Sequence, residues 1–366
     1  MEIKIDIDLK HEKIKNFLDF NGLEGLIFAS QTNFLWLTGG RLNNVIRNDD
    51  ISLVYLFLTK EKRYLIATES DAARVIEEEL AGLDFELIKY NWFDQSFVNG
   101  IKKTGITGKI GADFSFGDYR NIENEIINIR RNLNTFELKK YLNFCKDYSE
   151  IITDYCFKLK KNLTETEVAA GLNDKCFRSG IKLPILMVGS DERVFKFRHP
   201  CFTNKEIDKY ILIATCAERE GIYANVSRSI HFGKTPSELL SKQKAVNFII
   251  SSFFAESVCG KNLVDLFEKG KTFYKEAGYP NEWRNHLQGG ISGYKPLEYV
   301  INATNKIAIN ENNIMGFNPT IAGVKAEDPI LIEKNKSQIT VFNEKWPYEE
   351  FKIKDRIFKR PVILEL

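Results

Sequence analysis

The amino-acid sequence predicts two domains, an α/β domain over residues 1–134 and an α+β domain over residues 135–366. In the first part, apolar runs of strand length alternate with helical patterns, which is typical of α/β structure. A long amphipathic pattern then begins at Thr135, directly after a polar connector. Beyond it, strand and helix patterns mix without strict alternation. A chain of 366 residues is long enough for two domains of ordinary size.

The first domain contains five apolar runs that we interpret as strands. The second and third runs are joined by a short Lys-Glu-Lys turn, which indicates a hairpin. A helix is expected between the third and fourth runs, over residues 71–80. The predicted strands are residues 23–30, 51–59, 63–69, 85–91 and 109–115.

The second domain opens with a long predicted helix, because apolar residues recur at three- and four-residue spacing from Leu138 to Leu159. A second helix is expected over residues 164–177, where Thr164 and Glu167 have the spacing of a capping box. Further helices are predicted at residues 237–257 and 262–276. The predicted strands are residues 208–217, 221–232, 313–318, 328–334 and 337–342.

The composition indicates a soluble globular protein, with 43% hydrophobic and 28% charged residues. The 52 basic and 50 acidic residues nearly cancel, so net charge supports neither a nucleic-acid partner nor a membrane surface. No run approaches the ~20 apolar residues of a membrane span, and the charged N-terminus lacks an apolar signal core. Six cysteines are scattered without a C-x-x-C pair, which indicates reduced thiols. We therefore expect a cytoplasmic protein.

The strand over residues 221–232 has one polar face, formed by Tyr223, Asn225, Ser227 and Ser229. The opposite face carries the apolar side chains and should pack on helices. The polar face must then look either into a cavity or out to solvent. Periodicity alone favours solvent.

Two histidines have settings in which acid–base chemistry is conceivable. His199 precedes a proline, which favours an extended backbone, and histidine titrates near neutrality. A histidine that is only held by backbone hydrogen bonds is the simpler interpretation. His286 follows a Trp-Arg-Asn run, whereas His11 and His231 are expected to be structural or surface residues.

Several motifs, taken in order, resemble the creatinase, aminopeptidase P and methionine aminopeptidase superfamily, which has the pita-bread fold. That resemblance implies a creatinase-type N-terminal α/β domain over residues 1–134 and an α+β pita-bread domain over residues 135–366. The matching segments are NFLWLTGG (33–40), RHP (198–200), GIYANVSRSIHFG (221–233), HLQGGISG (286–293), GFNPTIAG (316–323) and KAED (325–328).

The resemblance also implies where a pair of divalent ions would be held, because the metallopeptidases of this superfamily use two aspartates, a histidine and two glutamates. The aspartate positions fall on Ala214 and Asn225, the histidine on Gly290, and the first glutamate on Asn318. Only the last glutamate is retained, as Glu327. Alanine and glycine side chains cannot bind a metal, and hard dications need anionic oxygen. We therefore expect no metal and no cofactor.

Within the superfamily, this loss of ligands resembles creatinase, whose relatives use the histidine of the HP step as acid and base. His199 occupies that position. The family's histidine before the glutamate of its H-E step is replaced by Leu297, followed by Glu298. Creatinases grip a guanidinium with acidic residues where this chain has Ser227 and Asn318, so creatine is not the expected substrate.

Three interpretations remain open. The first is a metal-independent hydrolase or lyase of a small amide, amidine or imino-acid-like compound, an Xaa-Pro aminopeptidase-like protein in name. The second is a catalytically inactive protein that binds a ligand or partner. The third is a metallo-aminopeptidase with relocated ligands drawn from His199, His286, Glu298 and Glu327. The first assigns catalysis to His199, Glu327 and Glu298, and substrate binding to His286, Asn225, Ser227, Asn318 and Arg41.

The resemblance further implies a homodimer, in which the N-terminal domain of one chain closes the site of the other. Arg41 and Arg47 follow the NFLWLTGG segment and could supply a cation for a substrate carboxylate. Arginines that are merely hydrated in a loop explain the same sequence equally well. The expected partners are thus a small-molecule substrate and a second copy of the chain.

Overall fold

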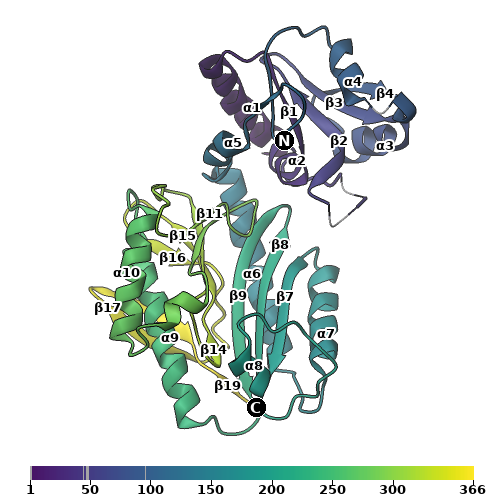
Figure 1. Cartoon of the computed structure of the whole chain (residues 1–366). Helices are drawn as coiled ribbons and strands as arrows, with labels where there is room; N and C mark the ends of the chain where they lie inside the picture. Colours follow the sequence, from purple (N-terminus) through teal and green to yellow (C-terminus); the bar gives the residue numbers. More distant parts are fainter. Residues whose placement is uncertain (1, 44, 47–48, 95) are drawn as a thin grey trace. The chain divides into compact units, whose positions relative to one another are not determined.

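The computed structural model describes residues 2–43, 45–46, 49–94 and 96–366. These residues form two compact units (Figure 1). The first unit runs as far as Arg130 and includes Asn134–Glu137, and the second contains Arg131–Leu133 and Leu138–Leu366. No helix in the described ranges has both the length and the apolar character needed to cross a membrane.

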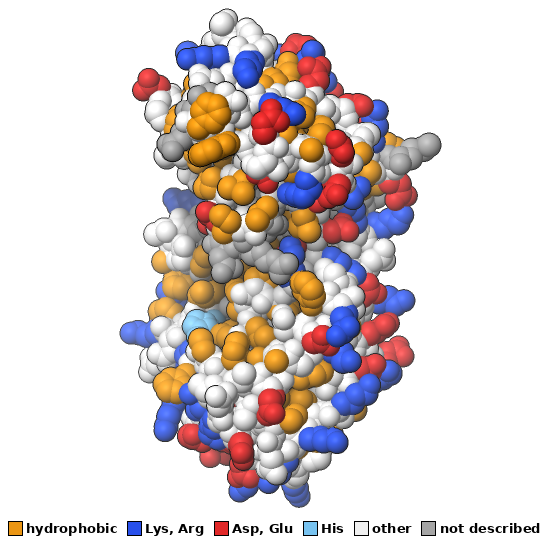
Figure 2. Space-filling model, turned by 90° about the vertical axis from the view of Figure 1, so that its right-hand side faces the viewer, with side chains coloured by type: hydrophobic (Ala, Val, Ile, Leu, Met, Phe, Trp, Pro, Cys, Tyr) orange, Lys and Arg blue, Asp and Glu red, His pale blue; other side chains and the backbone are white. Residues whose placement is uncertain are grey.

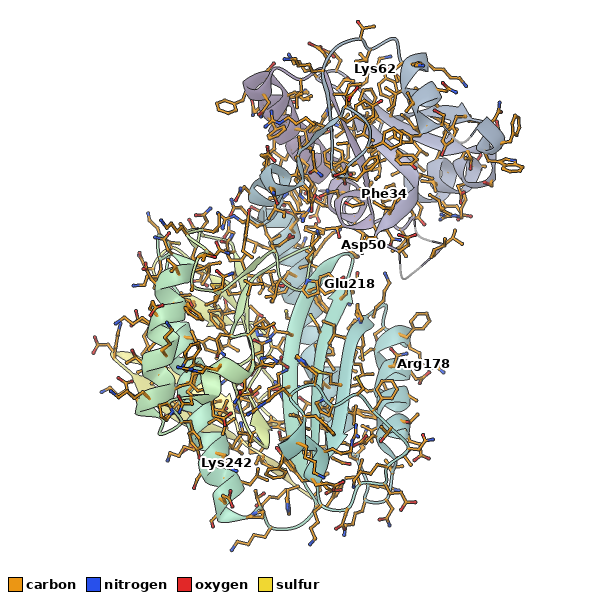
Figure 3. The ribbon with its side chains drawn as sticks, in the orientation of Figure 1. Phe34, Asp50, Lys62, Arg178, Glu218 and Lys242 are labelled. Carbon is orange, nitrogen blue, oxygen red and sulfur yellow. The ribbon has the colours of Figure 1, made fainter. Side chains whose placement is uncertain are left out.

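The first unit is built on one six-stranded sheet with the order β4-β3-β2-β1-β5-β6. The expected hairpin is confirmed, because β2 and β3 pair antiparallel. Helices pack on the sheet, and Phe34 of α2 is buried there (Figure 3). The elements are α1 (Glu2–Asn21), β1 (Gly25–Ser30), α2 (Gln31–Leu37), β2 (Ile51–Leu58), β3 (Arg63–Thr68), α3 (Glu69–Arg74), η1 (Val75–Glu79), β4 (Phe85–Tyr90), η2 (Trp92–Asp94), α4 (Phe97–Lys103), β5 (Ile110–Ala112), β6 (Arg120–Asn121) and α5 (Glu123–Arg130).

The five predicted strands are present, but this unit also contains elements that were not predicted, namely helices α1, α2, α4 and α5 and strand β6. The N-terminal residues form the helix α1, where no element was predicted. Its Lys10 ammonium is buried between the carboxylates of Asp6, 2.8 Å away, and Glu137, 2.9 Å away. The helix expected over residues 71–80 begins earlier, as α3, and continues as the π-helical turn η1.

The second unit is built on two larger sheets with helices on their outer sides (Figure 1), and the strand pairs β13-β14 and β17-β18 form two smaller ones. One sheet has the order β11-β10-β12-β15-β16, and the other has the order β19-β9-β8-β7. Helices α9 and α10 lie against the first sheet and helices α6 and α7 against the second. The elements are α6 (Thr135–Cys156), α7 (Glu165–Arg178), β7 (Lys182–Ser190), α8 (Glu192–Lys196), β8 (Tyr210–Arg219), β9 (Ile222–His231), α9 (Ser237–Glu256), α10 (Leu263–Glu276), η3 (Glu282–Asn285), β10 (Gly289–Ser292), β11 (Tyr299–Val300), β12 (Ile314–Phe317), β13 (Thr320–Ile321), β14 (Val324–Lys325), β15 (Asp328–Ile332), β16 (Ser337–Ile339), β17 (Tyr348–Ile353), β18 (Arg356–Pro361) and β19 (Leu364–Glu365).

The four helices predicted for this unit and its predicted strands are confirmed. The capping box of α7 is present, since Thr164 accepts from the Glu167 backbone and the Glu167 side chain accepts in return. The strands β8 and β9 form a long antiparallel hairpin, whose turn is held by Glu218 at the end of β8 (Figure 3). Strand β7 and the hairpin of β17 and β18 were not predicted. All six cysteines are free thiols, as expected.

Candidate functional site

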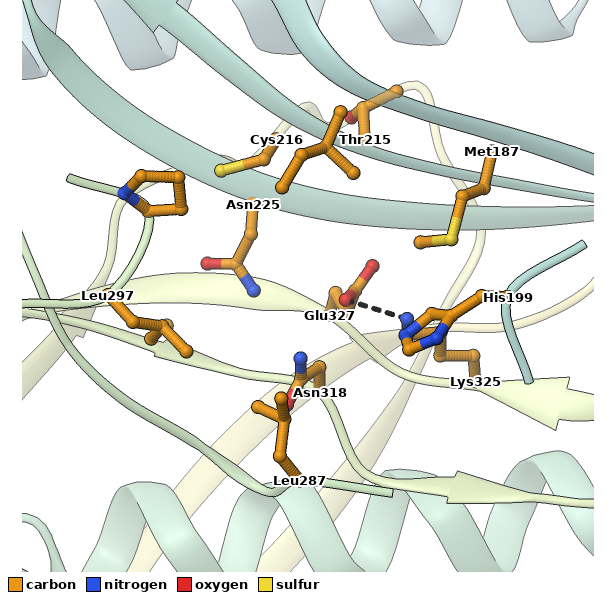
Figure 4. Close-up of a pocket in the computed structure, with 13 residues that line it drawn as sticks. Met187, His199, Thr215, Cys216, Asn225, Leu287, Leu297, Asn318, Lys325 and Glu327 are labelled. Carbon is orange, nitrogen blue, oxygen red and sulfur yellow. Dashed lines mark ion pairs between the residues drawn. The ribbon is translucent and has the colours of Figure 1, made fainter. Parts of the chain in front are cut away.

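A cavity of about 300 Å³ lies in the second unit (Figure 4). Strands of both sheets and the loops around them contribute its walls. One part of the wall is apolar and the other part carries polar and charged side chains. The lining residues are Ile185, Met187, His199, Thr215, Cys216, Asn225, Leu287, Pro296, Leu297, Gly316, Asn318, Lys325 and Glu327.

The polar face of β9 points into the protein, so the preference for solvent was wrong. Ser227 and Ser229 are 4% and 5% exposed, and Asn225 lines the cavity. The segment before β15 covers this face, because the Ser227 backbone N–H donates to the Glu327 carbonyl over 3.0 Å. Alternation in one strand cannot show that a second sheet covers its polar face.

His199 stands at the mouth of the cavity, where its side chain is exposed. The neighbouring Pro200 anchors it by packing on β7 at Gly189, where an added Cβ would lie 2.5 Å from the proline ring. Figure 2 shows hydrophobic side chains beside an exposed histidine on this face of the second unit. The exposed hydrophobic residues of the surrounding segments are Ile185, Phe195, Phe197, Phe202 and Leu287.

His286 does not line the cavity but contacts His199, with 2.8 Å between their Nε2 atoms. His286 Nδ1 lies 2.6 Å from the Leu287 carbonyl oxygen, so Nδ1 must carry the proton and donate. In neutral His286, Nε2 is then an acceptor, and His199 Nε2 must be the donor. The lone pair of His199 therefore resides on its Nδ1.

Both histidines are shifted toward the neutral form. Burial, followed by the positive charge of Lys325, lowers the pKa of His286 to about 3. The same two causes lower the pKa of His199. At neutral pH the pair carries no charge, and His199 is able to accept a proton.

A buried ion pair forms the floor of the cavity. Lys325 and Glu327 are 3% and 5% exposed, and Lys325 Nζ lies 3.1 Å from Glu327 Oε1 (Figure 4). Burial raises the pKa of Glu327, and the Lys325 charge opposes that shift. Lys325 was missed as a site residue, although its spacing of two residues from Glu327 is a usable signal. In an extended segment, side chains two residues apart point the same way.

The other polar lining groups are neutral. The Asn225 amide donates to the Phe317 carbonyl over 3.1 Å, next to Gly316, whose missing side chain leaves room for it. Asn318 Oδ1 is buried without a partner in the described part of the chain. The Cys216 thiol also lines the cavity, but burial raises its pKa, so it is a poor nucleophile.

Besides His286, three predicted site residues lie away from the cavity wall. The Glu298 side chain lies beside Gly293 of the β10–β11 loop. The Ser227 hydroxyl donates to the Lys325 carbonyl over 3.3 Å. Arg41 is exposed in the first unit, and Arg47 lies outside the described residues.

The residues at which the resemblance implies metal ligands do not fit a pair of dications. Asn225 and Asn318 are uncharged, and the carboxylate of Glu327 already faces an ammonium group. A Cβ on Gly290 would lie 1.9 Å from the Tyr299 carbonyl oxygen, so a histidine side chain there requires the backbone to move. Among the described residues, no three or more His, Cys, Asp or Glu side chains are grouped to hold a metal ion.

Residues 10–132 match the family model of the Creatinase/Prolidase N-terminal domain. An Xaa-Pro dipeptidase of Pyrococcus horikoshii is 22% identical over 359 residues, covering 91% of this chain and 97% of the dipeptidase. The X-Pro aminopeptidase of Thermotoga maritima superposes with a TM-score of 0.76 at 16% identity, covering 97% of this chain and 99% of that one.

The dipeptidase PepE of Mycobacterium ulcerans superposes with a TM-score of 0.78 at 14% identity, covering 99% of each chain. The chain has the fold of these peptidases, the pita-bread fold. Its first unit matches the creatinase-type N-terminal domain, and its second unit is the pita-bread domain. The fold predicted from the ordered motifs is confirmed.

Proposed function

We propose that this chain is a hydrolase that cleaves an amide-type bond of a small substrate without a bound metal, with His199 as acid and base. The names of its relatives, Xaa-Pro dipeptidase and X-Pro aminopeptidase, support hydrolysis of a bond to nitrogen. The observation that supports a reaction without a metal is the ion pair between the Lys325 ammonium and Glu327, the one carboxylate retained from the implied ligand set.

The charges of the site support this proposal. A dication beside Glu327 would meet the positive charge of Lys325 at close range, where repulsion is strong because both groups are buried. Asn225 and Asn318 supply no anionic oxygen to offset that repulsion. The lysine therefore balances the charge that a metal would otherwise balance.

The proposed reaction is a direct attack of water on the substrate carbonyl carbon. His199, neutral because its pKa is lowered, accepts the proton of the water at Nδ1 as the C–O bond forms. It then returns that proton to the leaving nitrogen as the C–N bond breaks, and the products are a carboxylic acid and an amine. His286 acts as a positioning residue, since it accepts from His199 Nε2 and fixes the tautomer.

The cavity walls support a small substrate with an apolar part. Met187, Pro296 and Leu297 offer an apolar surface, while Asn225 and Asn318 offer amide groups for orientation. Glu327 faces the same space. Glu298 and Ser227, which do not line the cavity, would act on a substrate only through other residues.

A screen of small amides, amidines and proline-containing dipeptides, run with and without a chelator, tests the proposal. We expect turnover that the chelator leaves unchanged, and less than one divalent ion per chain by elemental analysis. His199→Ala should lower single-turnover rates by roughly 100- to 10,000-fold, the usual effect of losing a general base. His286→Ala should slow the chemical step more than it weakens binding, because His286 fixes the tautomer of His199 and does not line the cavity.

Two tightly held ions per chain, or near-normal turnover by His199→Ala, would contradict this mechanism. The alternative function, a catalytically inactive binding protein, uses the same cavity. It predicts that small ligands bind while no compound in the screen is consumed.

A further inference from the structure

We propose that the cavity selects an uncharged carboxamide group, whose oxygen accepts from Lys325 and whose N–H donates to Glu327. That this carboxamide is the substrate that is cleaved rests on the proposed function, and the inference names the substrate class of that same site. As a statement about binding, it stands on the pattern of donors and acceptors in the cavity floor.

The donor of this pattern is the Lys325 ammonium. It lies in the cavity wall at the end of β14, and Glu327 Oε1, 3.1 Å away, accepts from it. An ammonium group has three N–H donors and no acceptor. One contact with Glu327 leaves donor capacity for an oxygen of a ligand in the cavity.

The acceptor of this pattern is Glu327 Oε2. This oxygen is buried and has no hydrogen-bond partner within the residues that the structure describes. A buried acceptor without a partner is destabilising, because it has lost its hydrogen bonds to water without gaining others. A ligand N–H placed beside it would remove that cost, and Asn318 Oδ1, also buried and unsatisfied, offers a second acceptor nearby in the lining.

The net charge of the lining decides between ligand classes. Lys325 and Glu327 are the only lysine, arginine, aspartate or glutamate side chains among the described residues of the lining, and their charges cancel. A carboxylate ligand offers only acceptors and would place negative charge against Glu327 Oε2. An amidinium ligand offers only donors and would place positive charge against Lys325. A carboxamide offers both an acceptor oxygen and an N–H donor, and matches both groups.

Three probes of nearly equal shape separate these classes: benzamide, benzoate and benzamidine. Their common ring suits the apolar wall of Met187, Pro296 and Leu297. Dissociation constants are measured by isothermal titration on the full chain at neutral pH. We expect benzamide to bind about tenfold more tightly than either charged probe, a difference of ~1.4 kcal/mol.

Charge variants then identify the groups that make this choice. Lys325→Met leaves a lone carboxylate, so the preference should move toward benzamidine. Glu327→Gln leaves a lone ammonium, so the preference should move toward benzoate. The double variant Lys325→Met/Glu327→Gln is the matched control, because it keeps the volume and removes both charges together. It should bind all three probes with similar, weaker affinity.

Tighter binding of benzoate or benzamidine by the wild-type chain, or no binding of any probe, would overturn the inference. The wild-type comparison decides the matter even where a single variant fails to fold, which thermal unfolding detects. The outcome is separable from the proposed hydrolysis. Probe preference without turnover in the screen contradicts the hydrolase alone, whereas turnover with a charged-probe preference contradicts the carboxamide assignment alone.

Discussion

At the scale of single residues, Lys325 changes the charge of the site, because its ammonium group pairs with the Glu327 carboxylate. The resemblance implies that Ala214, Asn225, Gly290 and Asn318 stand at the superfamily's ligand positions. It leaves open whether Glu327 faces a cation, because that depends on how the chain folds between β14 and β15. The structure places the Lys325 ammonium there, 3.1 Å away. The sequence alone suggests that the Glu327 carboxylate is left over from a metal site. In the structure this carboxylate forms an ion pair with Lys325.

His286 should make the protein sensitive to acid. Its folded-state pKa is about 3, against an ordinary value near 6.5, so the unfolded chain binds the proton more readily. The stability that depends on neutral His286 is therefore complete above a pH of about 6.5, and it is lost as the pH falls toward about 3. Near pH 4.5 the loss amounts to about 3 kcal/mol.

Urea denaturation at neutral pH and near pH 4.5, on the wild type and on His286→Gln, measures this contribution. Glutamine is neutral at both values, so the variant should lose less stability on acidification than the wild type does. An equal loss in both proteins would mean that His286 is protonated in the folded state without penalty.

At the scale of elements, the sequence predicts those whose apolar pattern has a clear period and misses those whose pattern is ambiguous. The long helix α6 and the hairpin of β8 and β9 are of the first kind. Helix α1 is of the second kind, because its first residues alternate between apolar and charged, as in a strand. Its buried residues Ile7, Ile14 and Leu18 show the helical face only once the whole segment is considered. Strand β7 is interrupted by Pro184 and is partly exposed, so its pattern is weak.

The first residue of β15 should be essential for the stability of the second unit. Asp328 is buried, and its two carboxylate oxygens lie 3.0 Å from Arg228 Nη1 and 2.6 Å from Arg360 Nη2. Both arginines are buried as well. Among the described residues, Asp328 is the carboxylate that pairs with both arginines. Asp328→Asn removes its charge, and leaving buried charges without compensation typically costs about 3–5 kcal/mol.

Chemical denaturation followed by tryptophan fluorescence tests this, since Trp346 packs against Arg228. Asp154→Asn is the matched control, because Asp154 also pairs with a cation, Lys345 at 3.0 Å, but both side chains are largely exposed. The control should change the free energy of unfolding little. A similar small effect for Asp328→Asn would show that the arginines find other compensation.

At the scale of the whole molecule, the order of motifs predicts the fold but not the chemistry. Six short segments spread along the chain are enough to identify the pita-bread fold, because their order reflects the order of the strands. The buried polar face of β9 depends on a second sheet that covers it. The contact between His199 and His286 joins residues that are 87 positions apart in the sequence. Such contacts follow from the packing of two sheets, which no local pattern contains.

The site should also depend on a second copy of the chain. We propose a homodimer in which Arg41 of one chain serves the cavity of the other. Arg41 is exposed in the first unit, directly after the paired glycines Gly39 and Gly40. Light scattering should give the mass of a dimer, and Arg41→Ala should lower activity more than Arg120→Ala, an exposed arginine of the same unit that pairs with Glu125.

Mixing subunits gives the sharper test of a shared site. Arg41→Ala and His199→Ala chains are each expected to be impaired as homodimers. In a mixed dimer, one cavity receives both defects and the other receives neither, so unfolding and reassembling the two variants together should restore activity. Random pairing makes half of the dimers mixed, each with one intact site, so about a quarter of the wild-type rate is expected. A monomeric mass, or no gain on mixing, would place Arg41 outside the site and leave each chain's cavity to work alone.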